Sequence, residues 1–447
     1  MCPASCRSAS GARLVAWIAV AFAGVSPLRA GVARAGTPEP GASQPPEAQS
    51  KPGSTTPPDS SSTPRASERQ RTEFGIVPLV GGDTDVGVGV GQLSTIAGLP
   101  PPSSRIPYRW AVESSAFISF NRDDGKYVIP YQDFYVQWTA PALLGGRLRL
   151  EARPSFTRET TQRYYGLGNA SVAPANDVPS RDFYGRTHPM LWARARYRFW
   201  DQMQVGLGSY YLQNWLSVPA GSTLAQQMAS GDETVRRLLG GTASHGVLIL
   251  EGLLLYDSRD SELATESGQF HQIKLRVSPR LGPSVPYAYQ QINITSRFFF
   301  PVIRDRLVLA VRYLADIQLG NPPFYELARY DDTYALGGGN GVRGVPGQRY
   351  YGKVKVFGSA EARVRVGSFN LRSKHMTVGV AGFFDAGRAW AELASHPELD
   401  GTGIGLKYGV GGGLRVQEGK TFVVRGDVAW SPDARPIGGY VTAGQAF

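Results

Sequence analysis

The sequence contains few of the residues that most catalytic and metal sites require. Only two of its 447 residues are cysteine and five are histidine. Cys2 and Cys6 precede an apolar run near the start, so they are expected to leave with a cleaved leader, and disulfides and thiolate metal sites are excluded. The histidines are scattered, and neither His-Glu-x-x-His nor Gly-x-Ser-x-Gly occurs. The sequence therefore predicts a non-enzyme without cofactor or metal.

Long hydrophobic runs are also absent. A spanning helix needs about 20 consecutive apolar residues, and no stretch reaches that length. A 12-residue apolar run at 14–25 follows two arginines and precedes Ala-Arg-Ala at 33–35. This pattern predicts a secretory signal peptide over residues 1–35. Its removal takes away four arginines and no acid, which lowers the formal net charge from +11 to about +7.

Residues 36–73 lack a periodic apolar face. Most of this segment is rich in proline, serine, glycine and threonine, so it cannot bury enough surface to fold and is predicted to be a disordered periplasmic segment. It is also too short to contain a folded module, because even a small domain needs about 50 residues with a core.

Residues 74–447 instead alternate strongly between apolar and charged positions. In one such stretch the apolar side chains are Val354, Val356, Ala360, Ala362, Val364 and Val366, and the charged ones are Lys353, Lys355, Glu361, Arg363 and Arg365. An apolar outer face and a charged inner face are the reverse of a soluble barrel and are typical of a barrel in a bilayer. Together with the leader, this places the protein in the outer membrane of a Gram-negative bacterium.

Strand counting predicts an all-β, transmembrane antiparallel barrel of 16 strands. Fifteen candidate strands run from 86–96 to 437–447, and bacterial barrels of this kind have even numbers, so 74–80 is taken as the sixteenth. This arrangement puts the long loop 319–352 outside the cell. A closed barrel leaves no free sheet edge, so a monomer is expected.

The inward-facing arginines have two interpretations. A basic lumen would favour anions or lipopolysaccharide phosphates, or the arginines would brace the barrel wall as a hydrogen-bonded lattice. Outer-membrane lipids and lipopolysaccharide are the expected partners, and nucleic acid is not.

The first and last strands contain residues that weaken pairing. Pro78 cannot donate to a ladder, and Gly438 and Gly439 favour bending. They indicate either a seam that opens laterally or an ordinary strand start beside a flexible turn.

Several segments together resemble the BamA/TamA superfamily of outer-membrane assembly and translocation barrels, also called bacterial surface antigen proteins. The resemblance covers roughly 74–447. It rests on Val342-Arg343-Gly344, on Phe383, Asp385 and Gly387 in a Phe-x-Asp-x-Gly pattern, on YYGLGN at 164–169, on DSRD at 257–260, and on Gly444 to Phe447, which resemble the family's C-terminal insertion signal. Val345 stands where an aromatic residue is usual.

The resemblance implies that the long extracellular loop folds into the lumen, where Arg343, beside Gly344, would meet Glu361 and Asp385. We refer to this arrangement as the loop–lumen lock. Alternation alone places both carboxylates inward. An arginine suits the role because its planar fork can bridge two carboxylates.

The resemblance also implies function. One possibility is a barrel that inserts or translocates proteins through the seam between its first and last strands, with unfolded outer-membrane clients or accessory periplasmic proteins as partners. The alternative is a passive pore or a structural or lipid-handling barrel. Family members usually carry periplasmic POTRA domains, and residues 36–73 leave no room for one, so the usual route of client capture is not expected.

Overall fold

The computed structural model describes residues 71–100, 108–123, 125–174, 176–262, 264–330, 333–334, 336–371, 374–418, 422–433 and 437–447. The predicted signal peptide and residues 36–70 lie outside these ranges.

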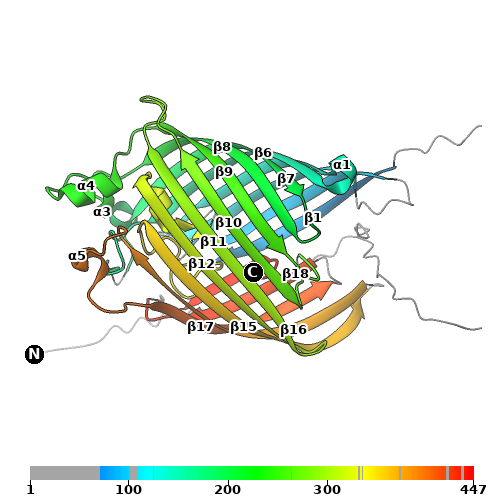
Figure 1. The fold of residues 1–447 in the computed structure, drawn as a ribbon. Helices are drawn as coiled ribbons and strands as arrows, with labels where there is room; N and C mark the ends of the chain where they lie inside the picture. Colours follow the sequence, from blue (N-terminus) through cyan, green and yellow to red (C-terminus); the bar gives the residue numbers. More distant parts are fainter. Residues whose placement is uncertain are drawn as a thin grey trace, which may run out of the picture.

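Antiparallel strands form one closed barrel (Figure 1). Sixteen strands build the wall, and the short β4 (Lys126–Val128) pairs with the end of β3, ahead of β5. Pairing of β1 with β19 closes the ring, as the sequence predicted for a 16-strand barrel. The wall strands are β1 (Arg71–Asp83), β2 (Gly87–Leu99), β3 (Trp110–Asp123), β5 (Tyr131–Ala142), β6 (Leu148–Arg163), β7 (Phe183–Arg198), β8 (Met203–Ser217), β9 (His245–Asp257), β10 (Gly268–Ser278), β11 (Ala288–Ile303), β12 (Leu307–Asn321), β15 (Val354–Leu371), β16 (Lys374–Trp390), β17 (Lys407–Glu418), β18 (Phe422–Trp430) and β19 (Gly438–Ala443).

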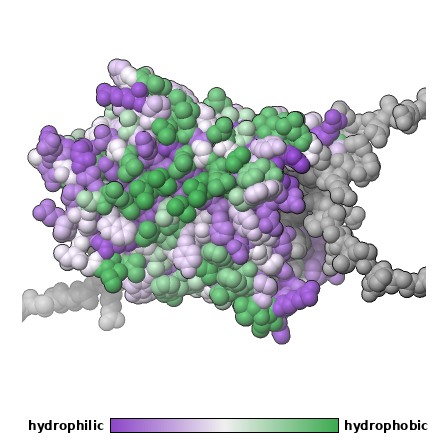
Figure 2. Space-filling view, in the orientation of Figure 1, coloured by the Kyte–Doolittle hydropathy of each residue, from purple (hydrophilic) through white to green (hydrophobic). Residues whose placement is uncertain are grey.

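Strand faces follow the predicted alternation. On β15, Val364 is 38% exposed while its neighbour Arg363 is 9% exposed, and on β16 Phe384 is 52% exposed while Asp385 is fully buried. Outward side chains are thus apolar and inward ones charged. Figure 2 shows hydrophobic side chains gathered over the strands and hydrophilic ones at the end that carries α3, α4 and α5.

The links between strands differ in length at the two ends of the barrel. The end shown with α3, α4 and α5 in Figure 1 carries the long links, which are 164–182, 218–244, 322–353 and 391–406, and we call it the long-link end. The other end carries α1 and links no longer than 258–267, and we call it the short-link end. Buried aromatic and aliphatic side chains join the four long links into one cluster, among them Tyr164, Leu224, Leu238, Phe324, Tyr351 and Ala391.

Short helices and one small ribbon lie in the links between the strands. Their bounds are α1 (Leu143–Gly146), α2 (Pro179–Asp182), α3 (Thr223–Met228), α4 (Glu233–Leu239), α5 (Pro397–Asp400), the 3₁₀ helix η1 (Phe324–Ala328), and the two-stranded ribbon β13 (Arg329–Tyr330) and β14 (Thr333–Tyr334). Within the described residues, none of the helices is both long and apolar enough to cross a membrane.

The observed first and last strands differ from their predicted bounds. The first strand begins at Arg71 rather than Phe74, because Thr72 and Glu73 continue the pairing with β2. Residues 71–73 therefore belong to the barrel and not to the preceding segment. The last strand ends at Ala443 rather than at residue 447, because Gly444 has a φ of +91°, which turns the chain out of the sheet.

Candidate functional site

Arg343 lies at the tip of the long link 322–353 and is 1% exposed. Its Nε and Nη2 donate to the two oxygens of Asp385 at 2.7 and 2.9 Å, and its Nη1 donates to Glu361 at 2.6 Å. The fork of the guanidinium therefore holds Asp385 bidentately and reaches a second carboxylate on the neighbouring strand. These are the two acids that the resemblance implied.

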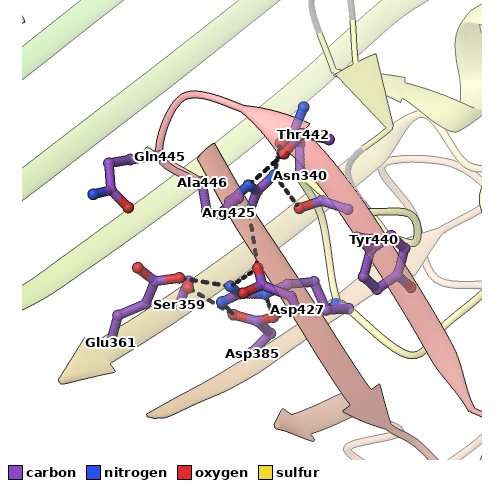
Figure 3. Close-up of polar contacts among 12 residues, drawn as sticks. Asn340, Ser359, Glu361, Asp385, Arg425, Asp427, Tyr440, Thr442, Gln445 and Ala446 are labelled. Atoms are coloured by element: carbon purple, nitrogen blue, oxygen red, sulfur yellow. Dashed lines mark hydrogen bonds and ion pairs between the residues drawn. The ribbon is translucent and has the colours of Figure 1, made fainter. Parts of the chain in front are cut away.

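A third carboxylate completes this site. Asp427 of β18 accepts from Arg343 Nη1 at 3.2 Å and also pairs with Arg415 and Arg425. Glu361 in turn accepts from Arg363 at 2.8 Å. The site is an alternating lattice of acids and guanidiniums on inward-facing positions, so no carboxylate is buried without a cationic partner. Figure 3 shows Glu361, Asp385 and Asp427 converging from three strands.

Further polar contacts hold the link beside Arg343. Arg425 donates to the carbonyl oxygen of Gly339 at 2.9 Å and to the side chain of Asn340 at 2.8 Å, and Arg312 donates to the Asn340 carbonyl oxygen at 2.7 Å. The Gly344 N–H donates to the Tyr440 hydroxyl at 2.9 Å. Residues 339–344, which we call the loop tip, therefore contact strands from β12 to β19.

Phe383 and Gly387, two motif residues of β16, both lie against the long link 322–353. Phe383 lies under Arg343, whose guanidinium carbon is 3.4 Å from the ring centroid, a cation–π arrangement. A Cβ on Gly387 would stand 2.3 Å from the Leu336 side chain. Gly344 has a φ of +92° and would place a Cβ 2.9 Å from the main chain of Trp430. Small size is required at both glycines.

The seam between β1 and β19 is short. β19 pairs with Gly82 and Asp83 of β1, and one further hydrogen bond runs from the Thr84 N–H to the Gly439 carbonyl oxygen at 3.1 Å. Within the described residues, no other residue of β1 pairs with β19. All thirteen residues of β1, by contrast, pair with β2.

The three candidate seam residues have different environments. Pro78 lies opposite Gln92 of β2, in the stretch of β1 that does not pair with β19 within the described residues. A Cβ on Gly438 would stand 2.9 Å from the Cα of Gly344, so this glycine makes space for the loop tip. Gly439 supplies the carbonyl oxygen of the last seam hydrogen bond.

Phe447 lies inside the barrel, whereas the Gly444 N–H still donates to the Val423 carbonyl oxygen of β18 at 2.7 Å. Phe447 is 7% exposed and packs on Phe299 of β11 and Ala310 of β12. Arg312 and Arg363 contact the last two residues, and Arg415 contacts Gln445. The resemblance to an insertion signal therefore concerns residues that are folded into the lumen here.

A cavity of about 580 Å³ adjoins the seam. Its lining includes Leu79 to Asp83 of β1, Val441 and Thr442 of β19 and Gly337 to Asn340 of the long link. Charged residues of β6, β7 and the long link complete it, among them Arg153, Glu159, Arg163, Arg186 and Arg329. In the described part of the chain, no three His, Cys, Asp or Glu side chains group closely enough to hold a metal ion.

Sequence reasoning missed several residues of the site, and three of them show why. Asp427 lies two residues after Arg425 on the same face of a predicted strand. The alternation along that strand was therefore a usable signal that Asp427 points inward. Tyr440 lies inside a strand and carries no local signal for a contact with Gly344. Gly409 belongs to a glycine run, and a Cβ there would stand 1.8 Å from the Arg343 carbonyl oxygen, a contact visible only once the link is folded back.

Comparisons with known proteins concern the family and the fold of the chain. The family model of the Omp85 superfamily domain matches residues 125–447. No curated protein matches the chain in sequence. Among solved structures, BamA from Haemophilus ducreyi lacking POTRA domains 1–3 superposes with a TM-score of 0.55 at 13% identity, over 84% of this chain and 70% of that one. CdiB from Acinetobacter baumannii matches with a TM-score of 0.44 at 13% identity, over 84% of this chain and 65% of that one.

Proposed function

Because the chain belongs to the Omp85 superfamily of outer-membrane barrels, whose members are non-enzymatic transporters and insertases, we propose that it inserts or translocates polypeptides by opening the seam between β1 and β19. The length of that seam carries the proposal. β19 pairs with two residues of β1, while β1 pairs with β2 along its whole length. Fewer ladder hydrogen bonds make separation of these two strands the least costly opening in the wall.

An open seam would expose the edge of β1 to an incoming strand. Residues 71–81 already lack pairing to β19 within the described chain. A free strand edge is a template for β-augmentation, because its main-chain groups bind another extended chain regardless of sequence. Pro78 removes one donor from this edge and would keep the pairing with a client reversible.

The contacts of Arg343 suggest a role in keeping the wall intact during opening. We assign the loop–lumen lock the task of bracing β15, β16 and β18, the strands that carry its three carboxylates. Removing one member of this buried ionic lattice would leave an uncompensated charge. The lattice therefore favours the arrangement of the strands in which every charge is paired. The loop tip also reaches β19 through Tyr440, so the lock and the seam are in contact.

The partners follow from the same mechanism. Unfolded outer-membrane polypeptides are the proposed clients, and accessory periplasmic proteins would deliver them. Outer-membrane lipids and lipopolysaccharide surround the barrel, which we propose acts as a monomer because its sheet is closed.

The test uses the barrel in liposomes with a urea-unfolded client barrel. Acceleration of client folding is expected, and it should be lost when a disulfide between Val80→Cys and Ala443→Cys fastens the seam two register positions beyond the Gly82–Val441 pair, then regained on reduction. The matched control is a disulfide between Val416→Cys and Val424→Cys, which are already paired across β17 and β18. No acceleration by the folded, reduced protein would contradict the proposal.

The same samples test the alternative of a passive pore, for which the 580 Å³ cavity is the favouring observation. A pore would conduct ions whether or not the seam is crosslinked. Conductance without client folding would establish the alternative if the disulfide between Val80→Cys and Ala443→Cys left that conductance unchanged.

A further inference from the structure

One part of the inner wall of the barrel carries apolar and aromatic side chains instead of charged ones. Six inward-facing residues of β7, β8 and β9 form this surface, which we call the inner belt: Met190, Trp192, Tyr210, Leu212, Val247 and Ile249. Polar side chains flank it along β9, with His245 before it and Glu251 after it. The inner belt therefore departs from the charged inward face of β15, and from the polar interior that is usual in a membrane barrel.

The cavity of about 580 Å³ that adjoins the seam also faces the inner belt. Four residues of the inner belt line the cavity: Met190, Tyr210, Leu212 and Ile249. Phe117 of β3 adds apolar surface from another strand. Sites for small molecules are typically cavities of about 300–1,000 Å³ with mostly apolar walls and a few polar groups. A ligand with a hydrocarbon chain would be stabilised here, because it would remove apolar side chains from contact with water.

Arg153 of β6 is the arginine of this cavity that lacks an acidic partner. The other four arginines of the lining each lie within 3.8 Å of a carboxylate: Arg163 of Asp85, Arg186 of Glu326, Arg276 of Glu251 and Arg329 of Glu159. Arg153 instead lies over the ring of Tyr135, with its guanidinium carbon 3.6 Å from the centroid. Among the described residues it forms no ion pair, and its buried Nε has no hydrogen-bond partner. Since Arg153 pairs with Trp192 across β6 and β7, this cation lies at the level of the inner belt.

Asp133 of β5 limits the charge of a group that could bind to Arg153. It lines the same cavity and accepts a hydrogen bond from Thr157 at 2.9 Å. A phosphate monoester with two negative charges would be repelled by this carboxylate. A ligand carboxylate has one negative charge, and its two oxygens match the planar fork of an arginine. The combination of Arg153 and Asp133 therefore favours a monoanionic head group.

We propose that this cavity binds an amphiphilic carboxylate, a ligand with one carboxylate at the end of a hydrocarbon chain. The carboxylate pairs with Arg153, and the chain packs on the inner belt. Such ligands partition into membranes, and the cavity lies beside the part of the wall that has the fewest ladder hydrogen bonds. Leu79 and Gly81 line it, and neither pairs with β19 within the described residues. This binding site is separate from the handling of polypeptides proposed above.

Isothermal titration of the full chain in lipid nanodiscs tests this proposal, with octanoate as the probe and empty nanodiscs as the blank. Octanoate should bind saturably. Butanoate, whose chain is shorter, should bind at least about tenfold more weakly, because it buries less hydrocarbon. Octylamine and octan-1-ol, which lack the carboxylate, should each bind about tenfold more weakly. No saturable binding of octanoate, or equal or tighter binding of octylamine or octan-1-ol, would overturn the proposal.

Arginine variants of β6 locate the head group of the ligand. Arg153→Gln should weaken octanoate binding about tenfold and leave the binding of octan-1-ol unchanged, because only the carboxylate uses the charge of Arg153. Arg149→Gln is the matched control, since Arg149 also faces inward on β6 but pairs with Glu151 at 2.9 Å. Equal octanoate binding by Arg153→Gln and Arg149→Gln would refute the site.

A protection measurement keeps Arg153 in place. Ser155 lines the cavity beside Arg153, so Ser155→Cys in a chain with Cys2→Ser and Cys6→Ser gives one thiol there. At ten times the Kd of this variant, octanoate should slow labelling of the thiol by a water-soluble maleimide about tenfold, and octylamine at the same concentration should not. Ser217→Cys, at the exposed end of β8, is the control and should react at the same rate with and without octanoate. Equal effects of octanoate on the two thiols, or no labelling of Ser155→Cys, would refute the site.

Discussion

The main chain of Arg343 lies against Gly409 of β17 so closely that a Cβ on Gly409 would stand 1.8 Å from the Arg343 carbonyl oxygen. The contact is with main chain, so rotating a side chain cannot relieve it. Gly409→Ala is therefore expected to displace the loop tip and to lower the thermal unfolding midpoint in detergent, measured by circular dichroism, as much as Arg343→Ala does.

Gly382→Ala is the control for this glycine prediction. Gly382 lies on β16, and a Cβ there would meet nothing within 4 Å. The loss of a glycine from a strand is then the same in both variants, and only the contact with the loop differs. Equal midpoints for Gly409→Ala and Gly382→Ala would show that the close approach has no energetic weight.

The geometry of the Arg343 fork leads to a second prediction. Arg343→Ala should lower the free energy of unfolding by about 3–5 kcal/mol, because it leaves buried Asp385 without its bidentate partner. Arg343→Lys should recover little of this loss, since an ammonium cannot hold two carboxylates in the same geometry. Urea unfolding in detergent, followed by tryptophan fluorescence, measures both values.

Arg365→Ala is the comparison for the arginine variants. Arg365 and Glu266 form an ion pair whose side chains are each about a third exposed, so its loss should cost at most ~1 kcal/mol. If Arg343→Ala cost no more than Arg365→Ala, the lattice around Arg343 would have no stabilising role.

Alternation predicted the architecture well and the contacts across the lumen only in part. A period of two fixes which face each residue occupies, and with it the inward positions of Glu361, Asp385 and Asp427. The strand count follows from the same pattern and the even-number rule. What lies opposite each inward position depends on the fold of the links. The contacts of Tyr440, Gly409 and Phe447 became visible only in three dimensions, because their partners are far away in sequence.

Glu392, in the link after β16, predicts a pH dependence at the long-link end. Its hydrogen bonds from Arg237 of α4, followed by those from Lys353, lower the pKa of Glu392 from its usual 4.5 to about 2. A lowered carboxyl pKa stabilises the folded form above pH 4.5, and this contribution is lost as the pH falls towards 2. Hydrogen-exchange protection of residues 233–239 should therefore decrease between pH 4.5 and about 2.

Glu392→Gln is the control for this titration. The amide keeps the shape but carries no charge, so protection of α4 should be lower at pH 6 and should change less between pH 4.5 and 2. His396 also contacts Glu392. An unchanged pH profile in Glu392→Gln would assign the dependence to another group.

Tyr440 connects the seam to the loop tip, and its hydroxyl tests whether the two act as one unit. Tyr440 lies opposite Asp83 of β1 and accepts the Gly344 N–H. Tyr440→Phe leaves that buried N–H without its partner and should cost about 1–3 kcal/mol of unfolding free energy. If the loop tip couples Arg343 to Tyr440, Arg343→Ala should already release Gly344 from Tyr440. The loss of unfolding free energy in the double variant should then be at least ~0.5 kcal/mol smaller than the sum of the losses in the two single variants. Additive losses would mean that Tyr440 stabilises β19 independently of Arg343. The loop–lumen lock would then not be coupled to β19 through Tyr440.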